Sequence, residues 1–193
     1  MPEMKPDLPT LTFDTPHAFE AWLAENHATS RGVWLRFAKK DSGGVSINYK
    51  QAVDVALCWG WIDGQAKRID ERWYLQRFTP RTARSIWSKI NCGKVTDLIA
   101  LGRMQPAGLA EIERAKLDGR WERAYDSPKN AGVPEDLEAA LARNKKAATF
   151  FKTLSSQNRY AILHRIQTAK KPETRQKRIA DFVGMLARGE TIH

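Results

Sequence analysis

Two neighbouring runs with the composition of β-strands constrain the fold of this chain more than any other feature. The first, WIDGQAKRID, begins at Trp61, and the second, RWYLQRF, is followed closely by Pro80. The polar pair Asp70-Glu71 separates the two runs, and a proline can close a strand but cannot continue its hydrogen-bond ladder. This order of residues predicts a β-hairpin. A further strand is predicted over residues 33–39, where an alternating pattern follows a glycine.

Helical patterns flank these strands. The N-terminal part is predicted to form helices over residues 16–26, 49–59 and 85–101. Ser85 is expected to cap the third helix, and four apolar residues fall within one core-facing arc of it. These residues are Trp87, Ile90, Leu98 and Leu101. Residues 1–126 are therefore predicted to form an α+β domain in which helices pack on a small antiparallel sheet.

Every pattern beyond Pro106 is helical. The turn-rich stretch SPKNAGVP at 127–134 interrupts these patterns and marks the best domain boundary. Four helices are predicted after it: residues 135–143, residues 145–154, a helix capped at Ser155-Ser156 that ends near Ala169, and a last helix that opens at Pro172. Residues 127–193 are therefore predicted to form an all-helical, basic segment that packs on the first domain as one unit.

Positive charge is concentrated in two stretches of a chain whose formal net charge is +10. Residues 143–178 hold eleven Lys or Arg against one acid, and residues 64–94 hold eight against two. A local excess of cations attracts anions such as nucleic acid, lipid headgroups or a phosphorylated small molecule. The alternative is that the charge run is only the solvated face of helices. The residues expected to supply electrostatic attraction are Arg159, Arg165, Lys170, Lys171 and Arg175.

The location of the protein is predicted from its N-terminal residues and its cysteines. Residues 1–16 lack the apolar core of a secretory signal, and no stretch approaches the 18 or so apolar residues that a membrane span requires. Cys58 and Cys92 are not arranged as a disulfide framework, and reduced thiols are expected. These observations predict a cytoplasmic protein without a membrane span.

The segment 59–91 places cations beside aromatic side chains. Because side chains alternate along a strand, Trp61, Asp63 and Lys67 are predicted to share one face, with Arg77 on a face of the next strand. Guanidinium groups bind phosphate or carboxylate, and aromatic rings stack on bases. The candidate binding residues are Trp61, Asp63, Lys67, Arg77, Arg81, Trp87, Lys89 and Asn91.

The structural alternative is that Asp63 forms an ion pair with Arg77 or Lys67 and that the tryptophans fill the core. Asp63 is also followed by Gly64, and this pair is a turn signal that would shorten the strand.

The sequence carries none of the standard motifs of catalysis or cofactor binding. It contains no G-x-G-x-x-G, no Walker loop and no G-x-S-x-G. Its four histidines have no metal-ligand spacing with one another or with the cysteines, so no metal and no cofactor is expected. Asp63 is the one carboxylate in a basic and aromatic neighbourhood, which suits an ion-pair partner better than a general base. The sequence therefore favours a binding protein over an enzyme.

Several distinctive sequence motifs in this chain resemble those of a known family. They are CWGWIDG at 58–64, QRFTPR at 76–81, SIWSKIN at 85–91 and RYAILHRIQTAKKPETR at 159–175. Their order resembles the YdeI/OmpD-associated (bacteriocin-protection) family over residues 12–193. The resemblance implies an association with bacteriocin protection and with an outer-membrane porin, and it brings no catalytic residues. Because residues 1–16 predict no export signal, direct contact with a porin is not expected.

Three hypotheses on function follow. The first is a non-enzymatic cytoplasmic stress or bacteriocin-protection type protein that binds an anionic partner, either nucleic acid or a phosphorylated metabolite. The second is a small-molecule-binding protein or enzyme with a site around Asp63, Arg77, Arg81 and Trp87. The third is a protein-interaction module that uses the basic helical tail.

Overall fold

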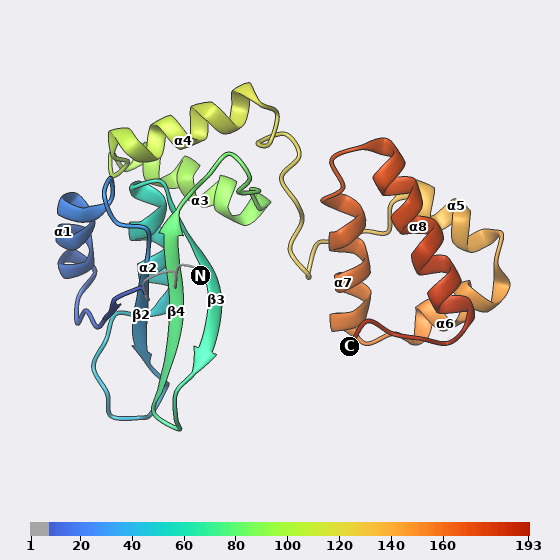
Figure 1. Ribbon diagram of the computed structural model, residues 1–193, viewed down its shortest axis with the longest axis horizontal. Helices are drawn as coiled ribbons and strands as arrows, with labels where there is room; N and C mark the ends of the chain where they lie inside the picture. The colour runs from blue at the N-terminus through green and yellow to red at the C-terminus, as the bar shows by residue number, and fades with distance from the viewer. Residues whose placement is uncertain (1–7) are drawn as a thin grey trace, which may run out of the picture. The chain divides into compact units, whose positions relative to one another are not determined.

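The computed structural model describes residues 8–193, which form two compact units (Figure 1). Unit 1 comprises residues 8–85 and 91–122, and unit 2 comprises residues 86–90 and 123–193. The first is built of strands and helices and the second of helices, so the predicted α+β class is confirmed. The division between residues 126 and 127 stays a prediction, and residues 1–7 of the predicted first domain lie outside the described residues.

A four-stranded sheet in the order β1-β2-β4-β3 forms the centre of unit 1. Its strands are β1 (Thr10–Leu11), β2 (Val33–Ala38), β3 (Trp61–Arg68) and β4 (Trp73–Pro80). The predicted hairpin is present, and β4 also pairs with β2 in antiparallel fashion. The prediction of a purely antiparallel sheet is wrong, because β1 runs parallel to β2. A strand of two residues is too short to carry the alternating pattern by which strands are recognised.

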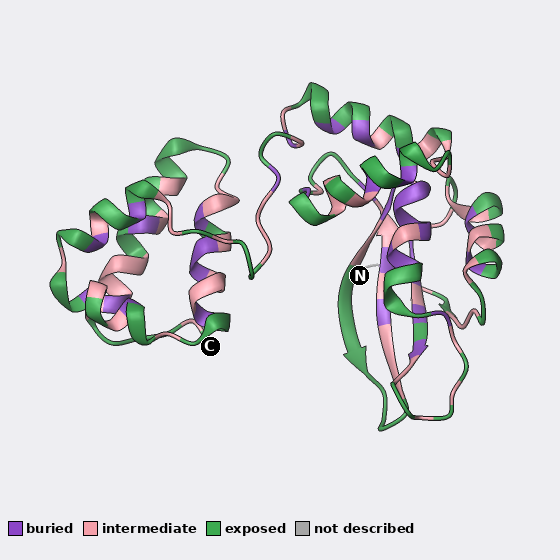
Figure 2. Ribbon diagram, turned by 180° about the vertical axis from the view of Figure 1, so that it is seen from behind, coloured by how far each residue is buried: buried purple, intermediate pink, exposed green. Residues whose placement is uncertain are grey.

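Four helices accompany this sheet in the described residues. They are α1 (Pro16–Asn26), α2 (Tyr49–Cys58), α3 (Lys89–Ala100) and α4 (Pro106–Leu117). Thr15 and Asn48 cap α1 and α2 by accepting hydrogen bonds from backbone N–H groups of the first turn, as the sequence predicts. α2 covers one face of the sheet: it lies behind the strands in Figure 1 and in front of them in Figure 2.

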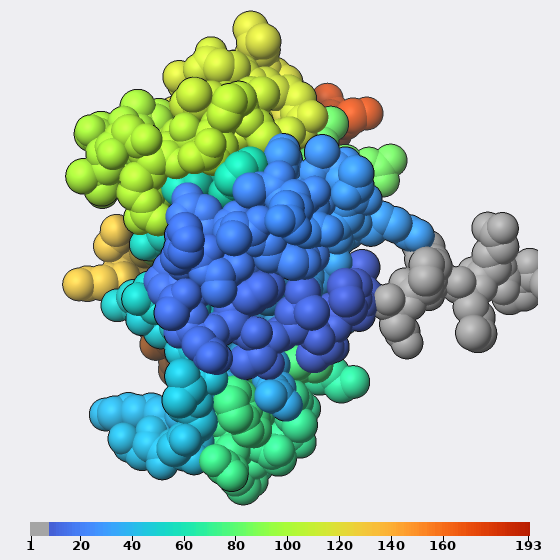
Figure 3. All heavy atoms as spheres, turned by 90° about the vertical axis from the view of Figure 1, so that its left-hand side faces the viewer, coloured from blue at the N-terminus to red at the C-terminus, as the bar shows by residue number. Residues whose placement is uncertain are grey.

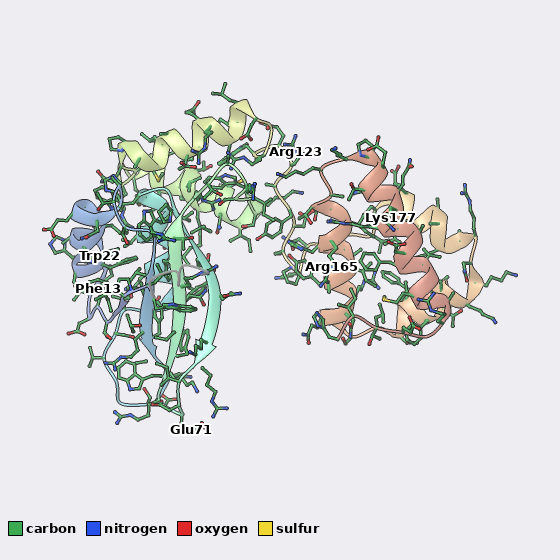
Figure 4. The ribbon with its side chains drawn as sticks, in the orientation of Figure 1. Phe13, Trp22, Glu71, Arg123, Arg165 and Lys177 are labelled. Carbon is green, nitrogen blue, oxygen red and sulfur yellow. The ribbon has the colours of Figure 1, made fainter. Side chains whose placement is uncertain are left out.

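Aromatic side chains join α1 to the covered face of the sheet. Phe13 and Trp22 lie close together beside α1 (Figure 4), and the ring of Trp22 meets that of Trp61 edge to face at 5.8 Å between centroids. Phe19 packs in the same way on Phe78 of β4. Large aromatic rings bury much apolar area, so this cluster holds α1 against the sheet. Figure 3 shows the outer surface of α1 in blue and that of α4 in yellow-green.

The helix predicted over residues 85–101 begins later, because tertiary contacts use the hydrogen-bonding groups that its first turn would need. The carbonyl oxygen of Ser85 accepts from Arg120 at 2.8 Å, and the N–H of Lys89 donates to Tyr125 instead of to Ser85. α3 therefore starts at Lys89. Of the predicted core-facing arc, Trp87 and Leu98 are buried, and the prediction is wrong for the other two residues. Ile90 is 52% exposed and Leu101 is 70% exposed. The residues of α3 that are buried are Val95 and Leu98.

Unit 2 contains four further helices close to the predicted ranges. They are α5 (Glu135–Ala142), α6 (Lys145–Thr153), α7 (Ser156–Gln167) and α8 (Pro172–Ala187). All four contribute to one apolar core, which includes Leu137, Phe151, Ile162 and Leu186. The buried side chain of Asn158 accepts hydrogen bonds from the N–H groups of residues 192 and 193, so the end of the chain is fixed on α7.

Gly108 lets the first turn of α4 approach the end of α2. A Cβ at residue 108 would overlap with the carbonyl oxygen of Cys58, whereas a Cβ at Gly93 of α3 would meet nothing within 4 Å. We predict that Gly108→Ala lowers the free energy of unfolding by about 1–3 kcal/mol, as overpacking does. Gly93→Ala is the control, and it should raise this free energy by about 0.5–1 kcal/mol because alanine favours helix. Urea denaturation followed by circular dichroism measures both, and equal stability of the two variants would contradict the prediction.

Candidate functional site

The register of the β3–β4 hairpin separates residues that strand alternation predicted to lie together. Asp63 pairs with Phe78 of β4, and Lys67 pairs with Leu75. Between Asp63 and Ala66 the register shifts at a β-bulge, and an extra residue turns every later side chain to the other face. Asp63 therefore lies on the helix-covered face and Lys67 on the opposite face. The predicted shared face of Trp61, Asp63 and Lys67 is wrong for Lys67.

The covered face uses Trp61 and Asp63 in packing. Trp61 is 1% exposed, and its indole Nε1 donates to the carbonyl oxygen of His27 at 3.3 Å. The Asp63 carboxylate accepts a hydrogen bond of 2.7 Å from the Tyr49 hydroxyl at the start of α2. The partner of Asp63 is thus a tyrosine rather than Arg77 or Lys67. The small-molecule hypothesis requires one site that contains both Asp63 and Arg77. These two residues lie on opposite faces of the sheet.

The opposite face of the sheet carries aromatic, aliphatic and cationic side chains, and within the described part of unit 1 no helix lies on it (Figures 1 and 2). We call it the helix-free face. Its residues follow from the register, since cross-strand partners share a face. They are Trp34, Arg36 and Ala38 of β2, Ile62 and Lys67 of β3, and Trp73, Leu75, Arg77 and Thr79 of β4.

Arg77 lies beside Trp34 at the centre of the helix-free face. A Cβ built on Gly64 would stand 3.2 Å from Arg77 Nε, so the absence of a side chain at Gly64 lets the guanidinium lie along β3. Arg77 Nε is closed to solvent and makes no hydrogen bond to any residue in 8–193. A buried donor without an acceptor is unusual in folded proteins and marks Arg77 as a candidate binding residue.

A second cation of this face is fixed by an aromatic ring. The guanidinium carbon of Arg36 lies 4.5 Å from the ring centroid of Trp73, and Arg36 Nε donates to the Thr12 hydroxyl at 3.0 Å. The indole also meets the loop before α2, where a Cβ on Gly44 would stand 2.7 Å from the ring. Trp73 therefore positions Arg36 through a cation–π contact. Sequence reasoning missed Trp34 and Arg36, because only the paired strands bring β2 next to the hairpin.

The remaining candidates of the first stretch lie beyond β4. Arg81 and Trp87 are buried, at 4% and 2% exposure, and Asn91 is half-buried on the first turn of α3. Lys89 forms an ion pair of 2.8 Å with Asp126. None of these four residues belongs to a strand of the sheet, so the helix-free face does not include them.

Asp126 binds the segment that precedes α5 to helix α7, within unit 2. Its carboxylate accepts from Lys89 and, at 2.8 Å, from Gln167, while its backbone carbonyl accepts from the Tyr160 hydroxyl at 3.0 Å. The hydrogen bond from Lys89 is the largest reason why the pKa of Asp126 lies below its ordinary value. Lys89 thus serves the structure of unit 2.

The five residues expected to attract an anion differ in their surroundings. Arg175 is structural, since it donates twice to Asp136, at 2.6 and 2.9 Å, and once to the carbonyl oxygen of Ile166 at 3.0 Å. Arg159 lies over the Phe151 ring at 4.8 Å. The other three, Arg165, Lys170 and Lys171, are exposed. Arg165 on α7 and Lys177 on α8 project from different helices (Figure 4).

Most cations in residues 143–178 lack a carboxylate partner among residues 8–193. Of the eleven, Arg175 and Lys177 form ion pairs. The remaining nine are Arg143, Lys145, Lys146, Lys152, Arg159, Arg165, Lys170, Lys171 and Arg178. Lys145 and Lys146 line a shallow hollow of about 510 Å³ with Phe150 and Leu186. We call these nine residues the unpaired cations of unit 2.

Residues 8–193 offer neither a reactive thiol nor a cluster of metal ligands. Burial raises the pKa of the Cys58 thiol to about 11 and also raises that of Cys92, so both thiols are protonated at neutral pH and poorly nucleophilic. Over the same residues, His, Cys, Asp and Glu nowhere gather in threes that could bind a metal ion. None of the helices described has the length and apolar character that crossing a bilayer requires.

Two family models match the chain. Residues 11–111, more than half of its length, match a domain of unknown function, DUF8412. Residues 130–189 match a family described as bacteriocin-protection, YdeI or OmpD-associated. The chain belongs to the DUF8412 family and carries a YdeI/OmpD-associated segment. No curated protein and no solved structure matches it.

The predicted resemblance to the YdeI/OmpD-associated family is confirmed for residues 130–189, which include helices α5 to α8. The sequence motifs at 58–64, 76–81 and 85–91 lie within the DUF8412 region instead. The helix-free face therefore belongs to the DUF8412 region, and the unpaired cations of unit 2 belong to the YdeI/OmpD-associated segment.

The ion pair of Asp136 with Arg175 predicts a pH-dependent stability of the YdeI/OmpD-associated segment. The hydrogen bond from Arg175 lowers the pKa of Asp136 in the folded state. A lowered folded pKa stabilises fully above the unfolded value of about 3.9, and this stabilisation is lost as the pH falls through the folded value. Asp136→Asn should therefore cost about 1 kcal/mol at neutral pH.

The same variant should lose less stability than the native protein between about pH 7 and about pH 3. Asp181→Asn is the matched control, because its ion pair with Lys177 is exposed and should contribute little. Urea denaturation at a series of pH values measures all three proteins. Equal pH dependence of Asp136→Asn and the native protein would show that this prediction is wrong.

Proposed function

We propose that the protein is a non-enzymatic cytoplasmic protein that binds an anionic partner, and that this partner is nucleic acid. The unpaired cations of unit 2 carry the proposal. Cations without local carboxylates create a positive field that attracts a polyanion. The proposal includes a role in stress or bacteriocin protection, and the description of the matched segment supports the second of these.

The placement of several lysines has no explanation in helix stability. Lys145 and Lys146 are the first two residues of α6, and Lys171 is the residue that precedes α8 as its N-cap. The N-terminus of a helix carries partial positive charge, so a cation there is unfavourable by about 0.3–1 kcal/mol. Charges kept at an energetic cost to folding favour a role in contacting an anion.

The distribution of the same cations favours nucleic acid over a phosphorylated metabolite. A small phosphorylated molecule needs several donors that converge on one point. Lys145 and Lys146 begin α6, Arg165 lies on α7, and Lys170 and Lys171 precede α8. Exposed cations on separate elements suit a partner that carries many phosphates along its length.

Binding to nucleic acid should depend steeply on salt. We predict that fluorescence anisotropy with a labelled oligonucleotide detects binding at about 50 mM salt and a loss of more than tenfold in affinity at about 200 mM, because neutralised phosphates release counterions. Replacing Lys145, Lys146, Lys170 and Lys171 by glutamine should weaken binding. It should also make the logarithmic salt dependence shallower, by about 0.7–0.9 for each phosphate that the variant no longer neutralises.

A matched control removes four cations that have carboxylate partners. These are Arg68, Arg114, Lys116 and Lys177. This control lowers the net charge equally and should retain most of the affinity. Absence of binding at low salt would overturn the proposal, and so would a control variant that binds as weakly as the lysine variant.

A further inference from the structure

The helix-free face of unit 1 carries positive charge without any acid. The strands β2, β3 and β4 contain a single carboxylate, Asp63, and the register places it on the covered face with Tyr49. Arg36, Lys67 and Arg77 all lie on the helix-free face. The positive charge of this face is therefore complementary to an anionic ligand.

Arg77 has the features of a phosphate-binding residue. Its Nε is buried and has no acceptor in the described residues, while its terminal nitrogens make no hydrogen bond there and reach solvent. Guanidinium groups bind phosphate oxygens through two parallel hydrogen bonds. A Cβ built on Gly64 would stand 3.2 Å from Nε and 3.4 Å from Nη2 of Arg77, so the guanidinium lies beside β3 at the residue that has no side chain.

Trp34 supplies an aromatic surface next to this guanidinium. It pairs directly with Arg77, it is partly exposed, and no ring or cation in the described residues stacks on it. Trp73 differs, since Arg36 stacks on its indole and the backbone at Gly44 lies against the ring. Arg36, Leu75 and Lys67 form the next row across three strands. An aromatic ring with cations around it on an open sheet suits an unpaired base whose phosphates contact the cations.

We propose that the helix-free face binds single-stranded nucleic acid, with a base stacked on Trp34 and the backbone contacted by Arg77 and Lys67. This inference rests on the proposed function for the class of partner and adds a second site and a preference for unpaired strands. The major groove of a duplex admits a helix or a two-stranded ribbon, whereas this face spreads over three strands. Bases within a duplex are also stacked on one another and cannot stack on Trp34.

The test compares a labelled oligothymidine of about 15 nucleotides with a duplex of equal length. Trp34→Ala and Arg77→Gln should each weaken single-strand binding about tenfold and leave duplex binding within about twofold. Lys67→Gln should weaken it about threefold. Arg68→Gln is the matched control, because Arg68 is the neighbour of Lys67 on the same strand and pairs with Tyr74 on the covered face; it should change neither affinity.

Loss of folding is separated from loss of binding by Trp34→Phe, which keeps an aromatic ring and should retain most of the single-strand affinity. Unchanged single-strand affinity in both Trp34→Ala and Arg77→Gln would overturn the inference. Equal effects of Lys67→Gln and Arg68→Gln would overturn it too, as would a polyglutamate peptide that competes as well as oligothymidine.

The two proposals fail in different ways. If the four-lysine variant of unit 2 loses binding to both oligonucleotides while the variants of the helix-free face bind normally, the further inference is wrong and the proposed function stands. If the four-lysine variant binds normally while Trp34→Ala and Arg77→Gln lose the single strand, the site in unit 2 is wrong and the helix-free face is the binding site.

Discussion

The register of the β3–β4 hairpin decides what each face of unit 1 can do. A bulge between Asp63 and Ala66 sends Asp63 and Lys67 of β3 to opposite faces. Asp63 joins the covered face, where Tyr49 satisfies it, and Lys67 joins Arg77 on the helix-free face. Without the extra residue, the carboxylate and the lysine would share a face. The bulge therefore decides that Lys67, and not Arg68, is the cation that β3 adds to Arg36 and Arg77 on the helix-free face.

The elements that the sequence predicted well are those specified by local chemistry. Capping residues such as Thr15 and Asn48, the turn at residues 70–71 and the apolar stripe of the last helix each act through neighbours close in the chain. The start of α3 was predicted wrongly because Arg120, far along the chain, occupies the carbonyl oxygen of Ser85. Local propensity favours a helix there, and the tertiary hydrogen bonds prevail.

The candidate site was predicted in composition and not in arrangement. Arg77 and Lys67 do share a face, but Trp61 and Asp63 lie on the other one, and the ring beside Arg77 is Trp34 from a distant strand. A bulge changes no residue type, so neither composition nor periodicity reveals it before the strands are paired. Trp34 has the pattern of an ordinary strand residue, because its relation to Arg77 exists only in the folded sheet.

Paired and unpaired charges have different roles in both family segments. Arg175 with Asp136, Lys89 with Asp126 and Lys94 with Asp54 join elements that are distant in sequence, so these pairs belong to the architecture. The unpaired cations of unit 2 form no ion pair in the described residues, and those at the start of α6 oppose the helix dipole. Unit 2 has its own apolar core and ion pairs such as that of Arg175 with Asp136, and its exposed lysines at the starts of α6 and α8 take no part in either. Unfavourable charge without a carboxylate partner in the described residues is the observation that supports our proposal of an anionic partner.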